Sequence, residues 1–206
     1  MSRLPDSATF HERVQDCFVA YRGHGVSLST VDFLLLDSWA EVEVPFEVIA
    51  RGIRKAAEAA LWDAPEGQGR LRSLKSCRRQ VEAEISKYVA RTAGRTEASG
   101  ATSEPFHVTR HKRLVAAIKK VTKPNVPPWV AMLPTPGDFA SSDRQESLAF
   151  NLLLRALPFS KRTTLLREAR LVVEKAPAMS ATTRRESLRF HRAALVRHAW
   201  SMSALW

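Results

Sequence analysis

The chain has 206 residues, of which 45% are hydrophobic and 26% charged, an ordinary balance for a folded protein that argues against wholesale disorder. This length can bury the core of one large helical domain or of two small ones. The longest apolar runs resemble Phe33–Leu36 and are far shorter than the roughly 20 residues of a membrane span, so we expect no membrane partner. The net charge of +11 at pH 7 favours an anionic partner.

The first part of the chain is predicted to be helical, because its helix-start signals recur at regular intervals. Thr9 and Glu12 have the spacing of a capping box, in which each side chain bonds the backbone N–H of the other residue. Ser29 and Asp32 mark the start of the next helix, and Gly23 ends the first one.

Helix 30–41 is apolar nearly all round, because Phe33, Leu34 and Leu36 add to a stripe formed by Val31 and Trp39. Such a helix is expected at the centre of its domain. Pro45 suits the first position of the following helix, where its missing N–H costs nothing. The buried line of that helix is Phe46, Ile49, Ile53, Ala57 and Leu61.

Ser73 is predicted to cap a fourth helix over 73–92. Its apolar stripe is Leu74, Cys77, Val81, Ile85 and Tyr88. Since Cys17 and Cys77 both fall on apolar helix faces, we expect buried thiols in a reducing cytoplasm, with a Cys17–Cys77 bridge as the alternative.

Residues 93–104 lose the apolar pattern and have the Gly- and Ser-containing composition of a linker. We therefore predict an N-terminal, acidic-to-neutral helical domain over 1–92 and a basic helical domain over 105–206.

Trp129 and Met132 are expected to anchor a proline-rich segment on the second core. No strand-like alternation is present, so the predicted fold class is all-α: a helical bundle domain followed by a basic helical region. The helices expected in the second domain are 108–121, 142–157, 160–175 and 183 to near the C-terminus.

The positive charge is unevenly distributed. Residues 1–69 contain 6 Lys/Arg and 11 Asp/Glu, whereas residues 70–206 contain 26 and 10. A surplus of cations on helix faces is typical of phosphate binding, although a solvated surface is the alternative. The candidate phosphate-binding residues are Arg72, Lys75, Arg78, Arg79, Arg110, Lys112, Arg113, Lys119, Lys120, Arg185, Arg189 and Arg192.

Other kinds of site have little support. His107 and His111 have helical metal-ligand spacing, but no Cys-x-x-Cys or His-Glu-x-x-His companion exists. The stretch 23–27 lacks the lysine of a phosphate-binding loop, and no Gly-x-Ser-x-Gly motif occurs. We expect a non-catalytic protein with no metal or cofactor.

Helices 30–41 and 45–62 have the order of a helix-turn-helix. The first turn of the second helix, which would enter the major groove, holds Pro45, Phe46 and Glu47 and offers no donor to a base edge. An ordinary helical hairpin is the better interpretation.

One set of residues within 21–85 follows a distinctive order: Tyr21, Gly25, Leu28, Ser29, Asp32, Leu35, Trp39, Val48, Ile49, Gly52, Ile53, Ala56, Ser73 and Leu74. This order resembles the helical domain of the DnaD-type primosome proteins. The resemblance implies a shared fold for this segment and a part in DNA binding and replication initiation. Leu74 stands where that family has a tyrosine.

The ending Leu205–Trp206 is similar to peptides that dock on the bacterial sliding clamp, which implies a protein partner for the C-terminal tail; a partly buried helix end is the alternative. Taken together, the sequence predicts a cytoplasmic, replication- or repair-associated protein that binds the phosphate backbone of DNA or RNA. The alternative is a helical adaptor or scaffold whose apolar grooves bind another protein.

Overall fold

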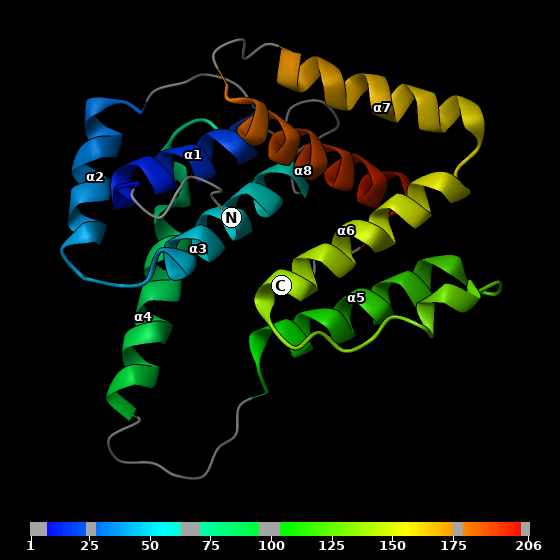
Figure 1. Cartoon of the computed structure of the whole chain (residues 1–206), viewed down its shortest axis with the longest axis horizontal. Coiled ribbons are helices and arrows are strands. Elements are labelled where there is room, and N and C mark those ends of the chain that lie inside the picture. The colour runs from blue at the N-terminus through cyan, green and yellow to red at the C-terminus, as the bar shows by residue number, and fades with distance from the viewer. Residues whose placement is uncertain (1–7, 24–27, 63–70, 95–103, 175–178, 203–206) are drawn as a thin grey trace. The chain divides into compact units, whose positions relative to one another are not determined.

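The computed structural model describes residues 8–23, 28–62, 71–94, 104–174 and 179–202 (Figure 1). Within these residues it contains eight α-helices and no strand, which confirms the predicted all-α class. Two short 3₁₀ turns, η1 (Leu74–Cys77) and η2 (Pro128–Val130), complete the described structure. The helices are α1 (Phe10–Arg22), α2 (Thr30–Ala40), α3 (Phe46–Trp62), α4 (Arg78–Gly94), α5 (Phe106–Thr122), α6 (Phe139–Ala156), α7 (Phe159–Glu174) and α8 (Ala181–Ala199).

The chain divides into two compact units. The first unit contains residues 1–100 and 169–191, and the second contains residues 101–168 and 192–206. The second unit holds 13 lysines and arginines against 5 acidic residues, while the first holds 19 against 16. The surplus of positive charge therefore belongs mainly to the second unit. The domain boundary at 93–104 stays a prediction, and most of that segment lies outside the described residues.

The predicted starts of the first two helices are confirmed. Thr9 and Glu12 form a capping box at α1, and Ser29 and Asp32 form another at α2. Gly23 ends α1 in the left-handed conformation, with φ of 76°, and its N–H donates to the carbonyl of Val19. A side chain has no room at Gly23, because a Cβ there would lie 2.5 Å from a ring nitrogen of His191.

Helix α3 is the centre of the first unit and packs against α1 and α4. Helices α3 and α4 lie close together at Gly52, where an added Cβ would lie 2.4 Å from the Cα of Val81. Cys17 and Cys77 are free thiols in this core. Burial raises the pKa of Cys17 to about 11 and that of Cys77 to about 12, so both thiols are poorly reactive.

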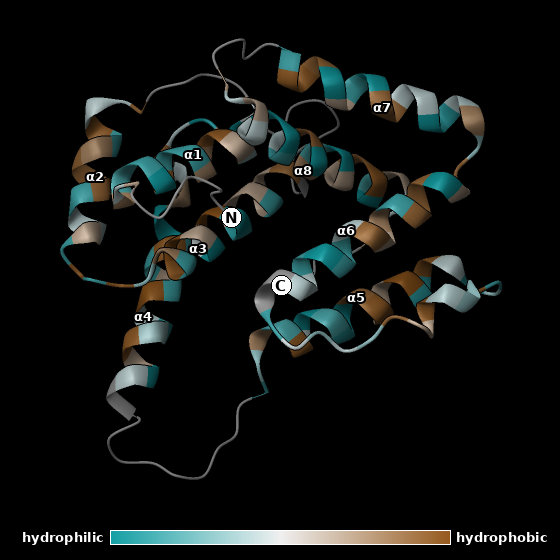
Figure 2. Ribbon diagram, in the orientation of Figure 1, coloured by the Kyte–Doolittle hydropathy of each residue, from teal (hydrophilic) through white to brown (hydrophobic). Residues whose placement is uncertain are grey.

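Two expectations about the first unit are wrong. Ser73 makes no side-chain cap, because the turn that follows it is the 3₁₀ turn η1, and α4 begins only at Arg78. Helix α2 is not central: Leu36 and Trp39 are buried, but Val31 and Leu34 are 60% and 65% exposed. Its apolar residues therefore lie on two sides of the helix, of which only one is buried. Figure 2 shows that α2 carries both hydrophobic and hydrophilic residues along its length.

The second unit is built on α5, which packs against α6 and η2. Its core includes Leu114, Ile118, Phe150, Leu153 and Val196. Trp129 packs against this core as expected. Met132 does not, because its side chain is 74% exposed.

Three helix starts in the second half of the chain differ from those predicted. Helix α6 begins after Asp138, which forms a capping box with Ser141, so Ser142 is an interior helix residue. Ser160 lies inside α7. Helix α8 is capped by Ser180, whose hydroxyl accepts from the N–H of Thr183.

No helix among the described residues is both long enough and apolar enough to cross a bilayer.

Candidate nucleic-acid interface

The outer side of α5 carries a row of cations. We call Lys112, Arg113, Lys119, Lys120 and Lys123 the α5 basic face; all five are exposed. Lys123 is the C-cap of α5, and with 3.6 residues per turn the other four positions fall within about a third of the helix circumference. Helix α5 contains no acidic residue, and Glu104, just before it, bonds Lys112. The face can therefore present several cations to one chain of phosphates.

Arg110 is not part of this face, and its assignment as a phosphate-binding residue is wrong. Its side chain is only 3% exposed, and its Nε and Nη2 donate to the carboxylate of Glu146 at 2.7 and 2.9 Å. Arg197 of α8 donates to the same carboxylate at 2.8 Å and stacks over the ring of Phe150. These residues form a buried Arg–Glu–Arg triad that ties α5, α6 and α8 together, so neither arginine can reach a phosphate.

The other candidate cations are placed on two further helices. Arg72, Lys75, Arg78 and Arg79 are exposed around η1 and the start of α4, where Arg78 Nε donates to Glu82 at 2.6 Å. On α8, Arg185 is exposed and Arg189 lies 3.8 Å from Glu186. The candidate cations are therefore divided between the two units.

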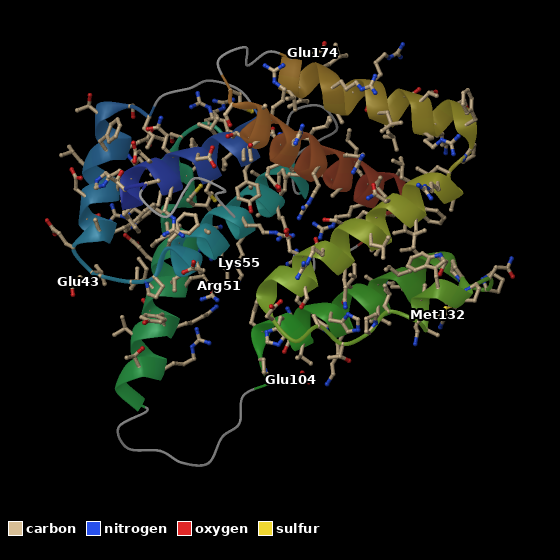
Figure 3. The ribbon with its side chains drawn as sticks, in the orientation of Figure 1. Glu43, Arg51, Lys55, Glu104, Met132 and Glu174 are labelled. Atoms are coloured by element: carbon tan, nitrogen blue, oxygen red, sulfur yellow. The ribbon has the colours of Figure 1, made fainter. Side chains whose placement is uncertain are left out.

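A further cation cluster in the first unit was missed from the sequence. The buried carboxylate of Glu84 accepts from Lys55 Nζ at 2.7 Å and from Lys87 Nζ at 3.2 Å, and Arg51 Nε lies 3.5 Å away. Arg51 and Lys55 both extend from α3 (Figure 3). Burial raises the pKa of Glu84, but the bonds from the two lysines outweigh burial and hold the pKa below its usual range. The cluster joins α3 to α4.

The two histidines that have metal-ligand spacing do not form a metal site with neighbouring groups. His111 is buried. Burial lowers the pKa of His111, and the side chain of Gln145 offsets part of this shift. Within the described part of the chain, no three His, Cys, Asp or Glu side chains are close enough to hold an ion.

A second kind of candidate site is a cavity of about 490 Å³ lined by α6, α7 and α8 of the second unit. Its lining is mainly leucine and arginine and contains no acidic residue. Sequence reasoning did not find this site, because its residues come from three helices. The leucines that line it are Leu148, Leu152, Leu154 and Leu166, and the other lining residues are Asn151, Arg155, Arg162 and Arg192. We call it the leucine–arginine groove.

Comparisons with protein-family models, with curated proteins and with solved structures found no match for this chain. The resemblance of residues 21–85 to the DnaD-type domain therefore stays a prediction. Leu205 and Trp206, the residues proposed for a protein partner, lie outside the described residues.

Proposed function

We propose that this protein binds the phosphate backbone of nucleic acid through the α5 basic face and does so without catalysis. The observation that supports it is the row of four exposed cations on an α-helix that contains no acidic residue, followed by exposed Lys123 at the C-cap of that helix. Phosphate contacts of this kind depend on charge and spacing rather than on base identity. The protein is therefore expected to bind DNA or RNA with little sequence preference.

The energetic consequence is a strong dependence on salt. Each phosphate that a cation neutralises releases counterions, and the logarithm of the affinity falls by about 0.9 per contact for each tenfold rise in salt. Five contacts correspond to a loss of affinity of about 500-fold between 50 and 200 mM salt. Nucleic acid is the proposed partner because regularly spaced phosphates match a row of cations along one helix.

The test compares two variants that carry the same change in charge. The first variant reverses Arg113, Lys119 and Lys120 to Glu, and the second reverses Arg72, Lys75 and Arg79. All six side chains are exposed, so both variants should keep the helical circular-dichroism spectrum of the wild type. Binding to labelled duplex DNA, single-stranded DNA and RNA is measured by fluorescence anisotropy over a range of salt concentrations.

The first variant should bind every sequence weakly and show a much shallower salt dependence, because three of five contacts are lost. The second variant should retain most of the affinity. Loss of binding in the second variant alone would move the contact surface to the start of α4. Absence of wild-type binding at 50 mM salt would refute nucleic-acid binding.

A protein–protein adaptor is the second candidate function. The observation that favours it is the leucine–arginine groove. A phosphate cannot bury the leucines that line it, whereas an apolar partner removes their surface from water, which is favourable. If the wild-type chain failed to bind nucleic acid, this alternative would take its place.

A further inference from the structure

The leucine–arginine groove selects for an occupant that is both apolar and acidic. Burying its leucines requires apolar side chains, and the positive charge of Arg155 and Arg162 in a lining without an acidic residue favours carboxylates. Leu148 at its edge is 52% exposed, so the site is an open groove that suits a helix rather than a closed pocket for a small molecule.

Helix α2 of the first unit presents this chemistry. Val31 and Leu34 are exposed on its outer side, and Val42 is exposed just beyond its end. Glu41 is exposed as well, and so is Asp37, whose carboxylate lies 2.7 Å from His11 Nε2; residues 30–45 contain no lysine or arginine. We call this surface the α2 acidic face. Exposed apolar residues grouped beside like charges commonly mark an interaction surface.

The residue spacing on the two surfaces also matches. Leu34 and Glu41 are seven residues apart, and Leu148 and Arg155 in the groove are seven apart on α6. Seven residues are about two helical turns, or about 10.5 Å. A helix α2 that runs parallel to α6 can therefore place leucine beside leucine and, two turns later, glutamate beside arginine.

We propose that α2 of one copy of this chain lies in the leucine–arginine groove of a second copy. Because the two surfaces are different, the contact is heterologous: a complex of two chains leaves one groove and one α2 unused, and these can bind further neighbours. The assembly is thus expected to grow with concentration rather than stop at a dimer. This proposal goes beyond phosphate binding and does not depend on it, because neither surface includes a residue of the α5 basic face.

The experiment measures mass by sedimentation velocity on protein freed of nucleic acid, from about 1 μM to about 1 mM, the range of weak dissociation constants. The mass of the wild type should rise with concentration. Leu34→Glu, which puts a charge on the apolar part of α2, should remain a single chain. A double variant, Arg155→Glu with Arg162→Glu, should also remain a single chain, because its groove repels the acidic helix.

The decisive sample is an equimolar mixture of these two variants. The Leu34→Glu chain keeps an intact groove and the arginine variant keeps an intact α2, so the mixture should form complexes of two chains and none larger. Met132→Glu and Arg167→Glu change exposed residues outside both surfaces and should assemble like the wild type.

A wild type that stays a single chain up to about 1 mM would overturn the proposal. A mixture that stays entirely single-chain, or an assembly that survives Leu34→Glu, would overturn it as well. These outcomes are separate from those of the nucleic-acid measurement, which uses reversals on α5.

Discussion

Replacing Glu146 by alanine should strongly destabilise the second unit. This carboxylate is buried and accepts three hydrogen bonds of 2.7 to 2.9 Å from Arg110 and Arg197. In Glu146→Ala both guanidinium groups keep their buried positions but lose their counter-ion. Removing one partner of a buried ion pair typically costs about 3–5 kcal/mol. Since a whole domain is stable by about 5–15 kcal/mol, this loss takes a large share of the total.

Urea denaturation followed by tryptophan fluorescence measures the effect, because Trp129 and Trp200 both pack against this core. The matched control is Glu168→Ala, which removes an exposed carboxylate of the same unit and should cost less than about 0.5 kcal/mol.

A second variant shows whether Glu146→Ala is destabilised because the buried arginines lose their counter-ion or because side-chain volume is lost. Replacing Arg110, Glu146 and Arg197 together by Met, Leu and Met removes all three charges and should recover most of the stability, because no ion is then left buried without a partner. A loss below about 1 kcal/mol in Glu146→Ala would show that the triad is open to water and would refute this reasoning.

Two further predictions concern packing and pH. Gly52→Ala should destabilise the first unit by about 1–3 kcal/mol, although alanine favours helices, because the new Cβ meets the backbone of Val81 and forces α3 away from α4; a neutral or stabilising result in chemical denaturation would contradict this packing. The pKa of His111 is lowered below 6.5, chiefly by burial, so the unfolded chain takes up a proton more readily than the folded one. The stability that comes from this shift is complete above about pH 6.5 and is lost as the pH falls through the folded pKa, so the second unit should weaken as the pH falls below about 6.5. His111→Gln should flatten this dependence, and an unchanged pH profile would rule out His111 as its source.

Helices and their apolar faces could be predicted because they follow from local periodicity. The starts of α6 and α8 could not, since each lies in a stretch with several residues that can cap a helix. At α8, Ser180 caps the helix, and Thr183 instead bonds Asp16, which is distant in sequence. Which residue caps the helix thus depends on a tertiary contact that the local sequence does not contain.

The orientation of α2 was missed for a related reason. A helix that is apolar on both sides gives no periodic signal for the side that faces the core. The structure buries the side that carries Asp32, whose carboxylate bonds Ser29 and the N–H of Lys75. Polarity alone would have placed that aspartate outside, and its bonding partners explain why it lies inside.

The candidate site shows the same division between local and distant information. Lys112, Arg113, Lys119 and Lys120 lie opposite the apolar stripe, and periodicity suffices to place them outside. Arg110 lies in line with Leu114 and Ala117, at i+4 and i+7, which indicates the buried side. Its carboxylate partner is 36 residues away, so the local pattern indicates burial of Arg110 but not the ion pair.

The positions of the cations also limit how much of the net charge can bind phosphate. Of the 13 lysines and arginines in the second unit, two are buried with Glu146 and three line the leucine–arginine groove. If all 13 bound phosphates, affinity would fall about 10⁷-fold between 50 and 200 mM salt, whereas the α5 basic face alone corresponds to about 500-fold. The slope of the affinity with salt concentration therefore reports how many cations contact phosphates. It therefore distinguishes one helix face that binds along a backbone from a diffuse attraction to the whole basic unit.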